Sequence, residues 1–321
     1  MAGDGVQVLN VQADSGFIET DSIRELTNRA LAYIRAGYPV HFCGPAGSGK
    51  TTLALHVAER LGRPVVLIYG DDETRTSDLV GSASGFSRRR LVDNYVHSVL
   101  KTEESLSPQW TDQRLLVACR EGLTLVYDEF TRSRPEANNV LLSVLEERVL
   151  TTPNLRVDGG YLQVHPNFSA IFTSNPEDYV GVHKTQDALR DRLVTIYLEP
   201  FDWETEVAIT QSRSGIPLDE AETVVRIVRA FRDVVLHGTS HSLRTCIKIA
   251  RILYQRGARV HPDDVVFAET CRDVLVSQLP FREASEAWAQ LQTLIRQEAA
   301  ASRTLGLVMK LPSDIKHGGK K

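Results

Sequence analysis

From residue 44 the chain reads Gly44-Pro45-Ala46-Gly47-Ser48-Gly49-Lys50-Thr51, a run that fits the pattern G-x-x-x-x-G-K-[ST]. It follows an apolar run, Pro39 to Cys43, and precedes a helix-like run, Thr52 to Leu61. A strand, a glycine-rich turn and a helix in this order are typical of a phosphate-binding loop, whose backbone N–H groups turn toward the β-phosphate. Lys50 is expected to reach the β and γ oxygens, and the Thr51 hydroxyl to bind Mg²⁺. These residues and Thr52 therefore predict a site for a nucleoside triphosphate, and the flanking strand and helix disfavour a chance glycine-rich turn.

The composition is that of a compact, soluble protein. Of the 321 residues, 42% are hydrophobic and 24% charged, and the formal net charge is −4, so one large or two ordinary domains are expected. Residues Met1 to Asn10 lack a basic segment followed by an apolar stretch, and nowhere do roughly 18 apolar residues run together. These features predict neither secretion nor contact with a membrane. The mild acidity also argues against a nucleic-acid partner.

The cysteines are scattered and form no C-x-x-C pair. They are Cys43, Cys119, Cys246 and Cys271. Such spacing favours neither a disulfide framework nor a zinc site. A cytoplasmic location is therefore expected.

Short apolar runs, each interpreted as a buried parallel strand, punctuate the first two hundred residues, and helical patterns lie between most of them. These runs are Val40–Cys43, Val65–Tyr69, Leu123–Tyr127, Ala170–Thr173 and Leu193–Leu198. The alternation predicts an α/β fold, a five-stranded parallel sheet between helices, with ligands outside the carboxyl ends of the strands. The phosphate-binding loop leaves the first such end.

After Pro200 the strand pattern stops and apolar residues recur three or four apart, which is typical of helices. The helical segments are Glu220–Leu236, Ser242–Gln255, Pro262–Gln278 and Arg282–Ala299. The expected domains are thus a nucleotide-binding core over 1–200 and a smaller, all-helical lid over 201–305. Residues 306–321 are lysine-rich and poor in apolar side chains, and they are expected to form a disordered tail.

The third apolar run ends in two carboxylates, Asp128 and Glu129, after Leu125-Val-Tyr127. This is the pattern of a Walker B strand. Asp128 would hold Mg²⁺ through water, while Glu129 would orient and polarise the water that attacks the γ-phosphate. Two acids at a strand end are often only a solvated turn. The upstream phosphate-binding loop makes the catalytic interpretation the stronger one.

The fourth run leads into Thr173-Ser174-Asn175-Pro176. This places the Asn175 amide at the carboxyl end of a strand, where it could contact the γ-phosphate and position the lytic water. Asn-Pro is also a turn initiator, and both interpretations can hold together.

From Leu31 to Leu198 these motifs resemble the AAA+ ATPases, and within them the MoxR-like group. The resemblance implies a ring-shaped homo-oligomer, a hexamer or similar, with ATP at the subunit interfaces. It also implies that an arginine from the neighbouring subunit completes each site. Arg192 matches the family position, and Arg190 is the alternative. The alternative is that these arginines only form ordinary surface ion pairs with Asp187 or Asp191.

The same resemblance implies three further features. Arg244, at the start of a predicted helix, is similar to the sensor 2 arginine that contacts the nucleotide phosphates. Residues 81–110 match the family's helix-2 insert, and 149–165 its hairpin before the fourth strand. Both insertions would face the ring pore or a partner, and ordinary surface loops are the alternative.

Three runs narrow the resemblance to the gas vesicle protein N family. They are Gly70 to Gly81, Val126 to Glu136 with Asn138-Asn139, and Phe172 to Glu177 followed by Gly181-Val-His183. The resemblance implies an ATP-hydrolysing assembly factor that acts on gas vesicle shell or accessory proteins. Two alternatives remain open. One is a MoxR-like chaperone that activates a metalloenzyme with a von Willebrand A partner, and the other is a nucleotide-gated binding protein with little turnover.

Overall fold

A computed structural model describes residues 17–93, 101–151, 160–176, 187–235, 243–261, 263–280 and 282–308. The chain divides into two compact units, one formed mainly by residues up to 199 and the other mainly by residues from 200 onward. Each unit has its own core of buried apolar side chains. Among the described residues, no helix is both long enough and apolar enough to cross a membrane.

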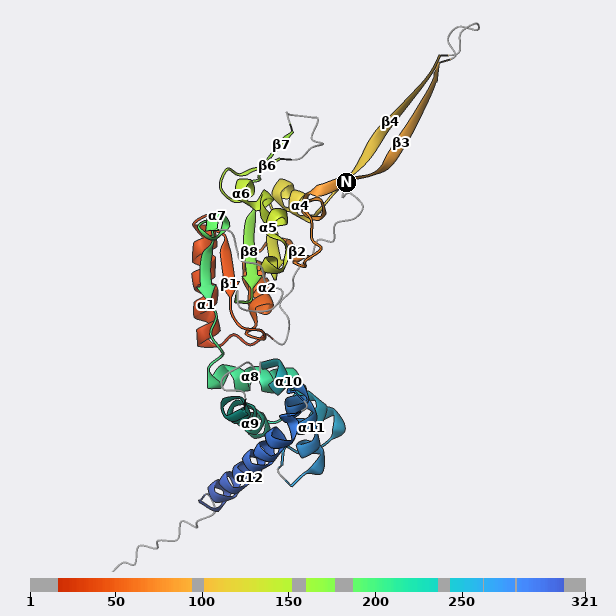
Figure 1. The fold of residues 1–321 in the computed structure, drawn as a ribbon. Coiled ribbons are helices and arrows are strands. Elements are labelled where there is room, and N and C mark those ends of the chain that lie inside the picture. The colour runs from red at the N-terminus through yellow and green to blue at the C-terminus, as the bar shows by residue number, and fades with distance from the viewer. Residues whose placement is uncertain are drawn as a thin grey trace, which may run out of the picture. The chain divides into compact units, whose positions relative to one another are not determined.

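The first unit is built on a parallel sheet of five strands in the order β2-β5-β8-β1-β9 (Figure 1). The strands are β1 Val40–Cys43, β2 Val65–Tyr69, β5 Thr124–Asp128, β8 Ser169–Ser174 and β9 Val194–Tyr197. The α/β fold predicted from the apolar runs is confirmed. Cys43 pairs in register with Ser174, and Tyr69 with Asp128, so the carboxyl ends of these strands meet at one edge of the sheet.

Helices cover this sheet, and two of them follow directly from local sequence. The first-unit helices are α1 Asp21–Arg35, α2 Lys50–Arg60, α3 Thr76–Val80, α4 Arg114–Glu121, η1 Phe130–Arg132, α5 Pro135–Asn138, α6 Val140–Leu145 and α7 Asp187–Arg190. Helix α1 begins with an acidic residue and ends with a basic one, which suits the helix dipole, and buries Ile23, Leu31 and Ile34 along one face. Helix α4 ends at Gly122, whose φ of 69° is the left-handed cap conformation that glycine adopts readily.

Two hairpins leave this unit. In the segment expected to be the helix-2 insert, β3 (Gly81–Asp93) pairs antiparallel with β4 (Lys101–Asp112) (Figure 1). The pairing shifts register between Ala83 and Phe86. Strands β6 (Val149–Thr151) and β7 (Tyr161–Gln163) also pair antiparallel, where the sequence predicted a hairpin. Its centre, 152–159, lies outside the described residues.

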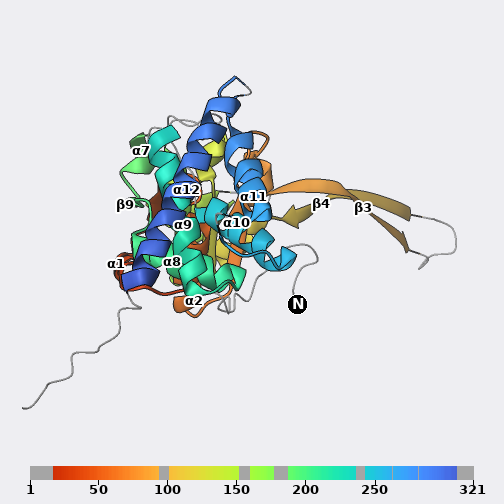
Figure 2. The same cartoon turned by 90° about the horizontal axis from the view of Figure 1, so that it is seen from below.

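The second unit is helical (Figure 2). Its helices are α8 Trp203–Ser214, α9 Leu218–Val235, α10 Leu243–Arg256, α11 Val265–Leu275, η2 Val276–Gln278 and α12 Ala284–Val308. Helix α8 packs against α9 and α10, and α12 against α9, around buried Phe231, Phe267 and Leu291. Helix α8 was not among the helices expected from the sequence. Helix α12 extends to Val308 and so takes in the first residues of the expected tail, while 309–321 lie outside the described residues.

Candidate functional site

The loop between β1 and α2 has a backbone conformation that depends on its glycines. Gly47 and Gly49 have φ values of 81° and 77°, in the left-handed region that side chains other than hydrogen rarely tolerate. Gly49 is the N-cap of α2 and, having no side chain, makes no side-chain capping hydrogen bond. Backbone N–H groups at a helix N-terminus attract anions, so the loop has the geometry of a phosphate site.

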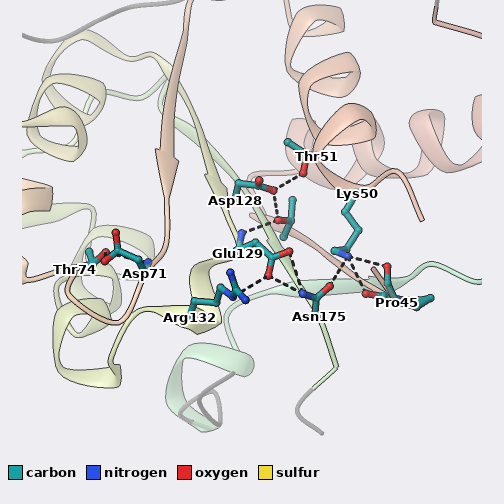
Figure 3. A network of polar contacts seen from close by, with 11 residues as sticks. Pro45, Lys50, Thr51, Asp71, Thr74, Asp128, Glu129, Arg132 and Asn175 are labelled. Carbon is teal, nitrogen blue, oxygen red and sulfur yellow. Dashed lines mark hydrogen bonds and ion pairs between the residues drawn. The ribbon is translucent and has the colours of Figure 1, made fainter. Parts of the chain in front are cut away.

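Lys50 is held at this loop by three hydrogen bonds (Figure 3). Its side chain is buried, with a residue exposure of 5%, and its Nζ donates to the Gly44 carbonyl at 2.9 Å and the Pro45 carbonyl at 3.0 Å. The third bond, 2.8 Å long, goes to Oδ1 of Asn175 at the end of β8. A buried ammonium therefore lies between the phosphate-binding loop and the neighbouring strand.

Thr51 and Asp128 form the second part of the site. The Thr51 hydroxyl donates to Oδ1 of Asp128 at 2.7 Å, and the Thr173 hydroxyl donates to the same oxygen at 2.5 Å. A hydroxyl beside a carboxylate is a hard oxygen donor pair, which Mg²⁺ prefers and completes with phosphate oxygens and water. Within the described ranges, no three His, Cys, Asp or Glu side chains gather into a metal site of their own. The residues present fit a magnesium ion shared with a bound phosphate.

Glu129 follows directly, in an unusual backbone conformation. Its φ is 54° and ψ 38°, and its N–H donates to the Thr173 hydroxyl at 2.9 Å. Its carboxylate accepts two hydrogen bonds from Nδ2 of Asn175, at 3.1 and 2.9 Å, and lies 4.0 Å from Nε of Arg132. The Asn175 amide thus contacts Lys50 through its oxygen and Glu129 through its nitrogen (Figure 3).

Three contributors to this arrangement were missed as site residues. Thr173 holds both Asp128 and the Glu129 backbone, and Arg132 adds a positive charge. Gly70 lies so close that a Cβ on it would be 2.3 Å from the Glu129 carbonyl oxygen. Their positions in the quoted motifs were their only signal in the sequence. The roles of Thr173 and Gly70 depend on contacts between segments far apart in the chain, and that of Arg132 on the turn that follows β5.

The arginines predicted to contact nucleotide have other surroundings within this chain, and Arg192, or alternatively Arg190, was expected to act on a neighbouring subunit. Arg192 donates to the Ala188 carbonyl and pairs with the Glu146 carboxylate, rather than with either aspartate beside it. Arg190 is exposed at the end of α7, and Arg244 is exposed in the first turn of α10, in the second unit. Within the first unit, the structure therefore brings Lys50 together with the Thr51, Asp128, Glu129 and Asn175 cluster.

Comparison with known proteins shows the family of this chain. Residues 39–193 match the model of the AAA domain (dynein-related subfamily). The chain is 50% identical to "Gas vesicle ATPase GvpN" of Ancylobacter aquaticus over 278 residues, which cover 87% of this chain and 78% of that protein. It is 46% identical to "Gas vesicle ATPase GvpN" of Haloferax mediterranei over 84% of this chain and 76% of that protein. "Protein NorQ" of Paracoccus denitrificans is 29% identical over 68% of this chain and 74% of its own length. The chain therefore belongs to the GvpN family of gas vesicle ATPases.

Proposed function

We propose that this chain binds ATP with Mg²⁺ at the site described above and uses its hydrolysis to help gas vesicles form. The row of polar contacts from Lys50 through Asn175 to Glu129, with Thr51 and Asp128 beside it, carries this proposal. The 50% identity to a relative named a gas vesicle ATPase supports its cellular part. In this role the protein works in the cytoplasm, associated with gas vesicles, on shell or accessory proteins.

The phosphate-binding loop and Lys50 are proposed to bind the nucleotide. The buried ammonium is a point charge suited to the β and γ oxygens, and the N–H groups at the start of α2 add to it. Thr51 and Asp128 would hold Mg²⁺. The bound ion would neutralise part of the negative charge on the phosphate oxygens.

Glu129 is proposed to act as the base. Its carboxylate takes a proton from the attacking water, whose oxygen bonds to the γ-phosphorus while the bond to the bridging oxygen of ADP breaks. ADP and inorganic phosphate leave. Asn175 is suited to positioning this carboxylate, because its amide nitrogen lies within 3.1 Å of both carboxylate oxygens.

The site is proposed to be completed across a subunit interface in a ring-shaped homo-oligomer, which we expect to be a hexamer. Arg192 would supply positive charge to the transition state in the neighbouring subunit. Its position just before β9, an edge strand of the sheet, supports this assignment. The phosphate contact expected of Arg244 stays a prediction, which the nucleotide affinity of an Arg244→Ala variant would test.

The identity values favour gas vesicle assembly over the other functions that the sequence left open. A chaperone that activates a metalloenzyme would be expected to resemble other MoxR-like proteins at least as well as gas vesicle proteins. The identity to NorQ is 29%, against 50% to the gas vesicle ATPase. A nucleotide-gated binding protein would hydrolyse little ATP, so measuring ATP turnover directly distinguishes it from an assembly ATPase.

The experiment that tests the site compares two variants in vitro. Lys50→Ala should weaken ATP binding because a charge on the phosphate oxygens is lost, and Glu129→Gln should bind ATP but hydrolyse it about 100-fold more slowly. Glu121→Gln, which changes an exposed acid on α4, is the matched control and should behave as the wild type. Fluorescent-nucleotide binding and phosphate release give the two readouts. Near-wild-type turnover in both site variants would contradict the assignment.

The cellular part is tested in a host that makes gas vesicles. Replacing the protein with its Glu129→Gln form should leave few or only small vesicles, because assembly then lacks an energy source. Electron microscopy and buoyancy measure this outcome, with Glu121→Gln again as control. Full-sized vesicles in normal numbers, made with a variant shown to be inactive in vitro, would rule out a role driven by hydrolysis.

A further inference from the structure

His41 is a buried histidine on the strand that leads to the phosphate-binding loop. It is the second residue of β1, which lies between β8 and β9 in the sheet, and only 8% of it is exposed. Its Nε2 lies 2.8 Å from the Ser174 hydroxyl on β8, and its Nδ1 lies 3.0 Å from the Thr195 hydroxyl on β9. The imidazole therefore links three adjacent strands through their side chains.

The ring is neutral at physiological pH. Burial, and then the positive charge of Arg190, lower the pKa of His41 to about 4. A neutral imidazole has one N–H donor and one acceptor nitrogen, and each hydroxyl partner can serve as either. Both contacts can thus be satisfied at once, whereas an imidazolium would place a second positive charge near Arg190.

Two partners of His41, Ser174 and Phe130, are direct neighbours of the proposed catalytic groups. Ser174 immediately precedes Asn175 at the end of β8. Phe130 immediately follows Glu129, and its ring meets the His41 ring edge-on, with centroids 5.2 Å apart and planes at 89°. Phe130 also packs edge-on against Phe172 of β8, at 5.2 Å. One imidazole thus touches the residue beside each of the two groups that would position and activate water.

We propose that His41 is a positioning residue for ATP hydrolysis. Through Ser174 it fixes the carboxyl end of β8 and with it the Asn175 amide, and through Phe130 it supports the turn that carries Glu129. It acts from within the sheet and without contact with the nucleotide. This inference rests on the proposed function, because it takes the roles of Asn175 and Glu129 from there.

The two hydrogen bonds of the ring offer matched variants. His41→Phe removes both hydrogen bonds but keeps a ring against Phe130, and it should lower kcat about tenfold with KM for ATP nearly unchanged, as expected when a catalytic group is misplaced. Ser174→Ala should reproduce this loss. Thr195→Val removes only the bond to β9 and should stay within about twofold of the wild type.

Conservative replacement separates positioning from general support. A glutamine amide can reach the place of Nε2, and an asparagine amide the place of Nδ1. His41→Gln should therefore recover most of the turnover, and His41→Asn should not. If both recover it equally, or if Thr195→Val is as slow as Ser174→Ala, the path through Ser174 is wrong.

A double-mutant cycle with Asn175→Ala decides whether His41 acts through that amide. If it does, His41→Phe should slow the Asn175→Ala variant much less than it slows the wild type. If the kcat loss of the double variant is instead the product of the two single losses, the inference is wrong, while the proposed function still holds. If Asn175→Ala alone turns over ATP at the wild-type rate, the proposed role of Asn175 fails, and the inference with it. Thermal unfolding of each variant is recorded, and a kcat loss that merely follows the loss of folded protein would also overturn it.

Discussion

Glu129 shows how single residues set the geometry of this site. Among the described residues, it and Arg148 are the non-glycine residues with positive φ, and such a conformation costs on the order of 1 kcal/mol or more. The Glu129 N–H donates to the Thr173 hydroxyl, and the Glu129 carbonyl accepts a hydrogen bond from the N–H of Arg132 at 2.9 Å. The conformation is therefore imposed by neighbours, at the residue that we propose as the base.

Gly70 is the neighbour that leaves room for this turn. A Cβ there would be 2.3 Å from the Glu129 carbonyl oxygen and 3.0 Å from the Ser133 hydroxyl oxygen, so Gly70→Ala should displace Glu129. We expect turnover to fall about tenfold and the free energy of unfolding to fall by about 1–3 kcal/mol. Gly62→Ala is the control, since Gly62 has a φ of 70° but nothing within 4 Å of its Cβ position. That change should lower stability alone, and equal turnover losses in the two variants would refute the steric argument.

The buried His41 should make the stability of the folded chain depend on pH. Its pKa of about 4 in the folded chain lies below the 6.5 of an unburied histidine, so the unfolded chain binds the extra proton first as the pH falls. The stability that the neutral ring contributes is present above pH 6.5 and is lost toward pH 4. The loss amounts to about 3 kcal/mol over this window. In denaturant titrations at several pH values, the wild type should lose stability faster than His41→Phe between those limits, and parallel curves would contradict the argument.

At the scale of elements, prediction succeeded where one segment carries its own signal. Each strand of the sheet is a short, mostly apolar run, and parallel strands end at one edge, so the meeting of Lys50, Asp128 and Asn175 follows from the sequence. Helix α8 was missed because its buried positions include Thr205, Glu206, Thr210 and Ser214, which give no apolar period. The residues at the two ends of α8 are nevertheless typical helix caps. Asp202 accepts the Thr205 N–H at the start, and Gly215 ends the helix at a φ of 83°.

The polar face of α8 carries a partly buried ion pair that links α8 to α9. Glu206 on α8 is 5% exposed and accepts from Nε of Arg229 on α9 at 2.6 Å, while Arg229 also donates to the Phe201 carbonyl at 2.8 Å. Removing Glu206 leaves the partly desolvated Arg229 guanidinium without its carboxylate, so Glu206→Ala should lower the free energy of unfolding by about 1–3 kcal/mol.

Denaturant unfolding followed by circular dichroism measures this loss. Glu269→Ala, an exposed position on α11, is the control and should stay within about 0.5 kcal/mol of the wild type. If the two variants are equally stable, the ion pair contributes nothing to this unit.

At the scale of the whole molecule, the proposed activity needs more than one copy of the chain. The described residues bring Lys50, Glu129 and Asn175 together, while Arg192 pairs with Glu146 and donates to Ala188. Its Nε is buried and has no hydrogen-bond partner in the described part of the chain. An arginine finger must reach a phosphate in the neighbouring subunit, so the pairing with Glu146 would have to open when a ring closes.

This requirement leads to a prediction for mixed assemblies. Arg192→Ala should retain ATP binding and lose hydrolysis by about a thousandfold, because the missing charge matters chiefly in the transition state. Lys50→Ala should be inactive for a different reason, since its own loop should bind ATP poorly, yet it keeps Arg192. Mixing the two inactive variants should therefore restore some phosphate release, because a Lys50→Ala subunit can donate its arginine to an Arg192→Ala neighbour that binds ATP. Arg190→Ala is the matched control and should remain active. If subunits that demonstrably exchange recover nothing, while Arg190→Ala abolishes hydrolysis, then Arg190 is the finger and Arg192 serves only its own subunit.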